Sequence, residues 1–252
     1  PRLYLGTMTF AWSQTSSRVD EPIAVEMMQR FLQQNEKYGA DVHHIDTARI
    51  YAGGKTESVV GACLPQCQNT GKRLLVGTKA HPSQPGGLSP EGIETQLQAS
   101  LQAMGDLSTI EEFYLHQPDT EHSLRESLGY TNDLVQKGVI RTVGMSNYHA
   151  SEVERAFAIC QEEGWAAPTV YQGLYNPLNR MVEKELLPLL KKNKCSFIAY
   201  NPLAAGLLTG KHTSLDEVQK GRFKKNQNYL PRFYTKENFA AIDLIRQACE
   251  KE

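Results

Sequence analysis

The sequence has few of the features that mark membrane, secreted or nucleic-acid-binding proteins. Its 252 residues carry 27 basic and 28 acidic side chains, so the basic surplus typical of nucleic-acid binding is absent. No apolar run approaches the roughly 18 residues of a membrane span, and neither a signal peptide nor an Asn-x-Ser/Thr acceptor is found. We therefore expect a soluble, cytoplasmic protein that binds neither nucleic acid nor a membrane.

Cysteine is also scarce. Five cysteines spread over a long chain do not form the dense framework of a small disulfide-rich domain. Cys63 and Cys67 lie four residues apart on a predicted helix, but no second Cys/His pair follows at ligand spacing, which argues against zinc. We predict reduced thiols, with these two packed in the core, and no metal site.

The usual nucleotide-binding motifs are missing. The string Gly53-Gly54-Lys55-Thr56 resembles the end of a P-loop, but Arg49 occupies the place of the required first glycine. The segment Gly206 to Lys211 also fails, because its glycines are one residue too close and His212 replaces the Ser or Thr. No Gly-x-Gly-x-x-Gly follows the first strand, which argues against a Rossmann site.

What the sequence does have is a regular alternation of short apolar runs with amphipathic helical stretches, which is typical of βα units and a parallel sheet. The predicted strands are Leu3–Met8, His43–Ala48, Leu74–Lys79, Glu112–His116, Thr142–Asn147, Thr169–Leu174 and Ser196–Asn201. Helices are predicted from Asp20 to before Gly39, about Thr56–Leu64, from Ser89 to Gly105, Ser123–Lys137, Ser151–Glu163, Glu183–Lys192 and from Thr235 onward.

Seven consecutive βα units in about 250 residues predict a (β/α)8 TIM barrel, an α/β fold, over an open doubly wound sheet. No composition shift suggests a linker, so we expect a single domain over residues 1–252. An eighth βα unit is not recognised. The chain is then a fragment, or a carboxyl-terminal segment is omitted, or the barrel closes in an unusual way, and the sequence leaves these alternatives open.

Polar residues cluster at the predicted carboxyl ends of the strands, where barrels of this type place their active sites. Asp46, Lys79 and His116 end three successive strands, and Tyr51 follows in a loop. A neighbouring ammonium lowers the pKa of a phenol, a carboxylate holds the ammonium, and an imidazole can orient a carbonyl. Taken singly, these residues could be a helix cap, a solvated lysine and a core histidine. Together they favour proton delivery to a developing alkoxide, and so carbonyl reduction where a hydride source is bound.

These residues also carry a family resemblance. The strings Gly6-Thr7-Met8, Asp46-Thr47-Ala48 with Tyr51, Thr78-Lys79 and Tyr114-Leu115-His116 resemble the aldo-keto reductases, NADPH-dependent (β/α)8-barrel enzymes that reduce aldehydes and ketones. The strings Gly144–Tyr148, Tyr171–Asn176 and Ala199–Lys211 look like the aflatoxin aldehyde reductase subfamily. The resemblance covers essentially the whole chain.

The resemblance implies a role for each matching residue. Tyr51 would be the general acid, Asp46 and Lys79 its tuning pair, and His116 the residue that orients the carbonyl. Ser146, Asn147 and Gln172 would bind the nicotinamide carboxamide of NADPH, Tyr200 would stack on the nicotinamide, and the next segment with Arg222 would hold the pyrophosphate. That segment comprises Asn201, Pro202, Leu203, Ala204, Ala205, Gly206, Leu207, Leu208, Thr209, Gly210 and Lys211. Asp46 is counted with the cofactor-binding residues too.

For the substrate, Tyr229 and Arg232 fall where the subfamily meets a substrate carboxylate, and Met8 and Trp12 would line the pocket beside His116. An arginine fork suits a carboxylate, so acidic aldehydes such as succinic semialdehyde or 2-carboxybenzaldehyde, and dialdehydes, are the expected class. A basic exposed loop can equally be solvated, and Trp12 can equally be a packing residue.

The chain departs from the family in lacking the eighth strand and helix, which there hold the adenine and 2′-phosphate; this leaves the choice between NADP and NAD open. Two alternatives to a reductase remain: a nucleotide-binding regulatory subunit resembling potassium-channel β subunits, and an inactive fragment. A homodimer is expected only from the subfamily likeness.

Overall fold

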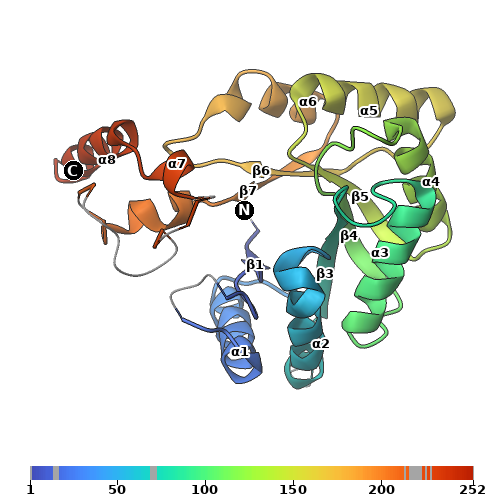
Figure 1. Cartoon of the computed structure of the whole chain (residues 1–252), viewed down its shortest axis with the longest axis horizontal. Coiled ribbons are helices and arrows are strands. Elements are labelled where there is room, and N and C mark those ends of the chain that lie inside the picture. Colours follow the sequence, from blue (N-terminus) through green and yellow to red (C-terminus); the bar gives the residue numbers. More distant parts are fainter. Residues whose placement is uncertain are drawn as a thin grey trace.

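The computed structural model describes residues 2–13, 17–68, 73–212, 214–215, 223–224, 226–227 and 229–251. In this part of the chain, seven parallel strands pair in sequential order and curl into a half-barrel (Figure 1). The strands are β1 Tyr4–Gly6, β2 Val42–Asp46, β3 Arg73–Ala80, β4 Ile110–Leu115, β5 Ile140–Ser146, β6 Val170–Leu174 and β7 Ser196–Tyr200. The predicted alternation of strands and helices and the (β/α)8 class are confirmed.

The helices that connect these strands lie on the outer side of the curled sheet (Figure 1). The α-helices are α1 Glu21–Lys37, α2 Lys55–Gln68, α3 Pro90–Ala103, α4 Leu124–Gln136, α5 Ala150–Glu163, α6 Leu186–Lys192, α7 Leu230–Phe233 and α8 Lys236–Cys249. Three 3-10 segments accompany them: η1 Tyr51–Gly54, η2 Met181–Glu183 and η3 Ala204–Thr209.

Helix α3 illustrates how local sequence sets an element and its packing. The Ser89 side chain accepts a hydrogen bond from the backbone N–H of Gly92 at 3.0 Å, which caps the helix as its sequence predicts. Ile93, Leu97 and Leu101 follow at helical spacing and are buried in the main core. Each such burial stabilises the fold by about 1.5–3 kcal/mol, so the apolar stripe fixes which face meets the sheet.

Helix α2 is longer than predicted. The sequence predicts an end at Leu64, because Pro65 lacks the N–H that a helix interior requires. The helix instead runs through Pro65 to Gln68. Cys63, Leu64 and Cys67 are all buried in the core, and their packing holds the additional turn in place. The prediction that Cys63 and Cys67 are packing residues is confirmed.

The segment predicted as one helix over Glu183–Lys192 is divided into η2 and α6. Pro188 lies in the first turn of α6, where a backbone N–H has no intrahelical partner and its absence costs little. A continuous helix would instead put that proline in its interior. Helix α7 is also unpredicted, because its four residues lie in a segment that reads as irregular.

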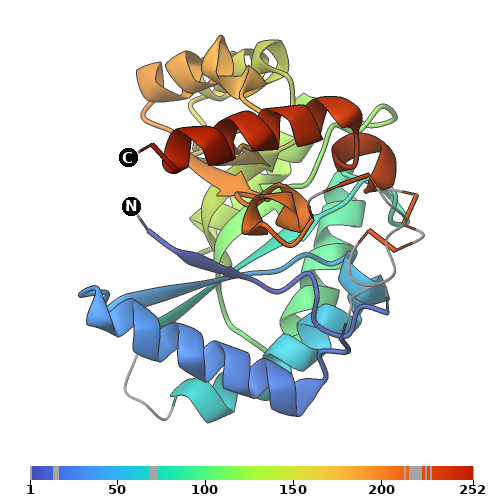
Figure 2. The ribbon, with the colours of Figure 1, turned by 90° about the vertical axis from the view of Figure 1, so that its left-hand side faces the viewer.

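The sheet has two open edges in the described part of the chain, since β1 pairs only with β2 and β7 only with β6. Figure 2 faces this open side and shows β1 between α1 and α8. The seven strands correspond to the seven that the sequence predicts, and no eighth strand occurs among the residues described. No described helix has the length and apolarity required to cross a membrane.

The concave face of the half-barrel is polar. Residues at the same register of adjacent parallel strands point to the same face, and the paired positions include His44 with Tyr4 and Tyr114 with Lys79. The apolar core lies on the other side, between the sheet and helices such as α1 to α6. Polar groups buried in the concave face must therefore satisfy one another, and this places the candidate site.

Candidate active site

The site is built around a buried ion pair at the carboxyl ends of β2 and β3. The Nζ atom of Lys79 lies 2.7 Å from Oδ1 of Asp46 and donates a second hydrogen bond to the backbone oxygen of Thr47, also at 2.7 Å. The Lys79 side chain is fully buried. An unpaired ammonium at such a position costs several kcal/mol, so the carboxylate and the carbonyl together hold the charge in place.

Gln172, on strand β6, also donates a hydrogen bond to the Asp46 carboxylate. Its Nε2 atom donates to Oδ1 of Asp46 at 2.8 Å, between residues 126 positions apart in the chain. Asp46 therefore accepts hydrogen bonds from both β3 and β6. The sequence suggests Gln172 only as a ligand of the cofactor amide, and its bond to Asp46 was not predicted.

Tyr51 opens the 3-10 segment η1, which follows the loop after β2. The backbone turns through left-handed conformations at Ala52 and Gly53, with φ of 48° and 63°, before α2 begins. This turn brings the Tyr51 ring over Lys79, whose Nζ lies 5.4 Å from the ring centroid. The phenol and the ammonium thus lie together as predicted, through a cation–π contact.

The predicted electrostatic effect on Tyr51 is wrong. We expected the Lys79 ammonium to lower the pKa of this phenol, but burial raises it well above its ordinary value, and the charge of Asp46 raises it further. The physical reason is that a phenolate here would lose its hydration and face a carboxylate. Tyr51 therefore keeps its proton across the neutral range and can act as a proton donor.

His116 lies one residue beyond β4 and packs between two aromatic side chains. Its ring contacts Tyr51 at a centroid distance of 5.8 Å and His81 at 5.0 Å, both edge to face. Burial, followed by the charges of Lys79 and His81, lowers the pKa of His116 to about 2. The imidazole is neutral at physiological pH. Among the described residues its buried Nδ1 atom has no hydrogen-bond partner, so the contacts with Tyr51 and His81 place the ring.

Ser146, Asn147 and Tyr200 form a hydrogen-bonded group at the ends of β5 and β7. Asn147 has a φ of 63°, and its Nδ2 donates to the backbone oxygen of His116 and to Oγ of Ser146, both at 3.0 Å. The Tyr200 hydroxyl donates to Oδ1 of Asn147 at 2.8 Å. These contacts bring the predicted carboxamide-binding residues of β5 beside the predicted carbonyl-orienting histidine.

Ser146 and Gln172 together offer the polar groups that a nicotinamide carboxamide would need. Among the described residues, Oε1 of Gln172 and the hydroxyl proton of Ser146 have no hydrogen-bond partner. One acceptor and one donor are the two groups that a primary amide requires from a binding site. Both side chains are buried, so their positions are fixed before any ligand arrives.

The predicted pyrophosphate segment includes η3 and has an unusual backbone. Positive φ values occur at Asn201, Ala204, Ala205, Gly206 and Gly210. The N–H groups of Ala204, Gly206 and Leu208 donate to backbone oxygens of the same segment, at Asn201 and, twice, at Leu203. Lys211 at its end is exposed. Arg222 lies outside the described residues.

Of the predicted substrate residues, Tyr229 lies close enough to Tyr51 to affect the pKa of that phenol. Tyr51 belongs to the predicted catalytic tetrad of Asp46, Tyr51, Lys79 and His116. The rings of Trp12 and Tyr229 are 6.3 Å apart, and Met8 is half-buried. Burial raises the pKa of the Tyr200 phenol, while the charge and hydrogen bond of Arg232 act to lower it. Arg232 therefore lies beside Tyr200, at the predicted cofactor site.

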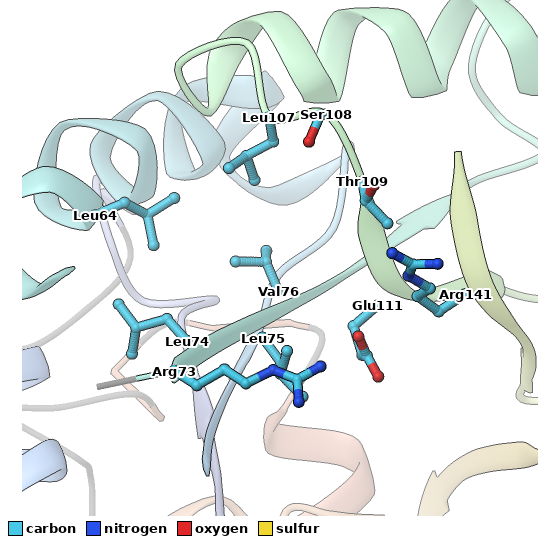
Figure 3. A pocket seen from close by; sticks show the side chains of 10 residues that line it. All are labelled: Leu64, Arg73, Leu74, Leu75, Val76, Leu107, Ser108, Thr109, Glu111 and Arg141. Carbon is cyan, nitrogen blue, oxygen red and sulfur yellow. The ribbon is translucent and has the colours of Figure 1, made fainter. Parts of the chain in front are cut away.

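A separate cavity of about 260 Å³ lies at the opposite, amino-terminal end of the strands (Figure 3). It contains Arg73, Glu111 and Arg141, each one of the first two residues of its strand. None of the predicted site residues lines it. The tetrad and this cavity thus occupy opposite ends of the sheet.

The sequence analysis did not identify two residues that lie near the tetrad as site residues. His81 packs on His116, and the ring of Tyr114 lies 5.4 Å from Nζ of Lys79. Strand alternation could have identified Tyr114, because it stands two residues before His116 and shares its face. His81 similarly stands two residues after Lys79.

Comparison of the sequence with known proteins agrees with this geometry. Residues 2–252 match the model of the aldo/keto reductase family, and the chain belongs to this family. It is 35% identical to aflatoxin B1 aldehyde reductase member 2 of Rattus norvegicus over 254 residues, which cover 98% of this chain and 66% of the rat protein. It is 34% identical to human aldo-keto reductase family 7 member A3, covering 99% of this chain and 74% of that protein.

A fungal relative, oxidoreductase sirO of Leptosphaeria maculans, is 31% identical, with 100% of this chain and 75% of the relative covered. The chain spans about two thirds of the length of the rat protein. The likeness to the aflatoxin aldehyde reductases that the sequence suggests is thereby confirmed.

Proposed function

We propose that this protein is an NADPH-dependent aldehyde reductase in which Tyr51 donates a proton to the carbonyl oxygen. The observation that carries the proposal is the buried Lys79–Asp46 pair beneath the Tyr51 ring, with neutral His116 packed against that ring. A protonated phenol, a fixed positive charge and a neutral imidazole suit the stabilisation of an alkoxide as it forms.

Each side chain has a distinct part in this proposal. Tyr51 holds the proton at its hydroxyl, because burial and the charge of Asp46 both disfavour the phenolate. Lys79 places a positive charge next to the phenol, which eases proton release once negative charge develops on the substrate oxygen. His116 stays uncharged and orients the carbonyl.

The cofactor supplies a hydride to the carbonyl carbon when it is bound. Ser146 and Gln172 would hold its carboxamide through the hydroxyl proton and the side-chain oxygen described above, with Asn147 beside them. The backbone of η3 and the Lys211 ammonium would hold its phosphates. The preference for NADPH over NADH rests on the family and is part of the proposal.

We further propose that the substrates are aldehydes bearing a carboxylate, or dialdehydes. Arg232 is exposed beside Tyr200, and a guanidinium can bind a carboxylate with two parallel hydrogen bonds. Trp12 and Tyr229 would supply apolar walls. The names of the aldehyde reductases among the relatives support aldehydes as substrates in general.

The test is the loss of reduced-nicotinamide absorbance with NADPH and with NADH, using 2-carboxybenzaldehyde and succinic semialdehyde. Turnover with NADPH that disappears in Tyr51→Phe is the expected result. Cofactor binding by calorimetry without any turnover would contradict the reductase and favour the regulatory-subunit alternative. Absence of both would favour an inactive fragment.

A further inference from the structure

The concave face of the sheet holds a second buried carboxylate that the proposed reaction does not use. Glu112 stands on β4 and is 9% exposed. Its Oε1 accepts a hydrogen bond from the Tyr4 hydroxyl at 2.7 Å and its Oε2 accepts one from the Tyr114 hydroxyl at 2.8 Å. Both oxygens therefore accept a hydrogen bond from a phenol. Burial raises the pKa of this carboxyl, and the two hydrogen bonds act to lower it.

The two phenols remain donors because they keep their protons. Burial raises the pKa of Tyr114 well above its ordinary value, with the charges of Glu112 and Asp46 adding to the effect. Burial also raises the pKa of Tyr4, and the charge of Glu112 contributes. Each tyrosine is thus tied to Glu112 through its hydroxyl across the neutral range.

Tyr114 connects this carboxylate to the tetrad. It pairs in register with Lys79 of β3, and its ring centroid lies 5.4 Å from Nζ of Lys79. The Tyr51 ring lies at the same distance from that atom. The ammonium therefore has an aromatic ring contact from each of two elements, β4 and η1, in addition to its hydrogen bonds to Asp46 and Thr47.

The backbone around the Tyr114 ring is shaped to hold it. A Cβ atom on Gly144 of β5 would lie 2.4 Å from Cδ1 of Tyr114, so only glycine leaves room for the ring there. A Cβ atom on Gly77 of β3 would lie 3.4 Å from Cβ of Glu112. The ring thus rests against bare backbone on one side and is anchored at its hydroxyl by Glu112.

We propose that Tyr114 and Glu112 form a buried platform that positions the Lys79 ammonium beneath Tyr51, so that both act as positioning residues for proton donation. Glu112 acts through Tyr114, whose hydroxyl it fixes. The platform is separate from the Asp46 ion pair, which holds the same ammonium by hydrogen bonding. This inference deepens the proposed reductase function and rests on it for its kinetic part.

Its first test needs no turnover. A ring face close to the Lys79 side chain shifts the NMR signals of its ε-methylene protons upfield, and the Lys79→Met variant assigns those signals. We expect the signals to move fully downfield in Tyr114→Leu. They should move only partly in Tyr114→Phe and in Glu112→Gln, which keep the ring but disturb the hydrogen bond that anchors it. Unchanged signals in Tyr114→Leu would overturn the proposal.

The matched control is Glu111→Gln, the neighbouring residue on β4, which lines the cavity at the other end of the sheet (Figure 3). Its Lys79 signals should match those of the unaltered protein. Thermal unfolding of each variant identifies any that fails to fold. If Tyr114→Leu fails to fold, Tyr114→Phe and Glu112→Gln still test the proposal.

The kinetic test separates positioning from general support of the fold. We expect kcat to fall about tenfold in Tyr114→Leu, the size of a buried cation–π contact, with the KM for the aldehyde unchanged. Tyr114→Phe should recover most of this loss. Equal losses in Tyr114→Phe and Tyr114→Leu, or a change confined to KM, would contradict the platform. No turnover in the unaltered protein would instead count against the proposed function, while the NMR result would still decide the placement of Lys79.

Discussion

The two halves of the candidate site are held by different means. On the rim formed by β2 to β6, the side chains bond to one another across the sheet, as Lys79 and Gln172 do to Asp46. Among the residues described after β7, several side-chain hydrogen bonds are local, such as that from the Thr209 hydroxyl to the backbone oxygen of Gly206. Strand register thus fixes the Lys79–Asp46 pair beneath the proposed proton donor, while the region after β7, with its own packing, carries the predicted pyrophosphate and substrate residues.

The loop region also has a separate small core. Its buried members are Ala204, Ala205, Leu207, Phe223, Phe233 and Phe239, which do not belong to the main cluster between sheet and helices. This separation suggests that substitutions on the rim will change the chemical step, whereas substitutions after β7 will change binding. The following predictions test that division, from the largest expected effect to the smallest.

Tyr51→Phe should have the largest effect, because it removes only the hydroxyl that carries the proton. We expect kcat to fall by about 1,000-fold, within the range for loss of a general acid, with the fold unchanged. Steady-state kinetics with NADPH and 2-carboxybenzaldehyde provide the measurement. Tyr38→Phe is the matched control, since Tyr38 is 82% exposed at the end of α1, and it should behave as the unaltered protein.

Lys79→Met should impair both turnover and stability. Among the described residues, the substitution leaves the Asp46 carboxylate with the hydrogen bond from Gln172 as its one side-chain contact. Breaking a buried pair in this way lowers the free energy of unfolding by about 3 kcal/mol. Urea unfolding at pH 7 measures the loss. Lys55→Met, at an exposed position at the start of α2, should leave both properties unchanged. A stable Lys79→Met protein would show that the pair contributes little to the rim.

Arg232→Leu should act on binding alone. We expect the KM for carboxylate-bearing aldehydes to rise about tenfold, because a charged hydrogen bond is lost, while kcat changes little. An uncharged aldehyde of similar size should show no change in KM. Arg155→Leu, at an exposed position in α5, is the control. Equal increases for charged and uncharged aldehydes would remove Arg232 from the carboxylate site.

Asp119→Asn tests the hydrogen bonds that the Asp119 carboxylate accepts in the loop after β4, and it should have the smallest effect. Burial raises the pKa of Asp119, but hydrogen bonds from the backbone N–H groups of Leu88 and Glu121 and from the His122 ring outweigh it and lower the pKa below 3.8. A lowered pKa in the folded state means that the carboxylate stabilises the fold above pH 3.8 and that this stabilisation is lost as the pH falls through the folded-state pKa.

We therefore expect Asp119→Asn to lower the free energy of unfolding by about 1–2 kcal/mol at pH 7. The difference from the unaltered protein should shrink below about pH 4, where Asp119 itself becomes protonated. Urea unfolding as a function of pH measures both. Glu121→Gln, at an exposed neighbouring position, should have no such effect, and a pH-independent difference would contradict the role of the charge.

Much of the rim could be predicted from the sequence, because strand ends follow from local patterns. Asp46 ends β2 and Lys79 is the next-to-last residue of β3, so parallel pairing alone brings them together. The bond between Gln172 and Asp46 could not be predicted, since it depends on how strongly the sheet curls. The pKa of Tyr51 was predicted in the wrong direction, because burial cannot be judged from the neighbouring charge alone.

The region after β7 was less predictable. Helix α7 is only four residues long and has no periodic pattern to reveal it. The left-handed residues Ala204 and Ala205 are alanines, which give no sign of positive φ in the way that glycine does. Arg232 was placed at the site only through the family resemblance, and its position beside Tyr200 depends on packing between distant segments.

The most direct test of the account follows hydride transfer and asks whether it depends on the Tyr51 hydroxyl. NADPH carrying deuterium at the transferable C4 position is incubated with 2-carboxybenzaldehyde and either the unaltered protein or Tyr51→Phe, and the alcohol is analysed by mass spectrometry. We predict one deuterium per alcohol, in amounts equal to the NADPH consumed, from the unaltered protein and almost none from the variant. Labelled alcohol formed equally fast by Tyr51→Phe, or its absence from both, would contradict the account.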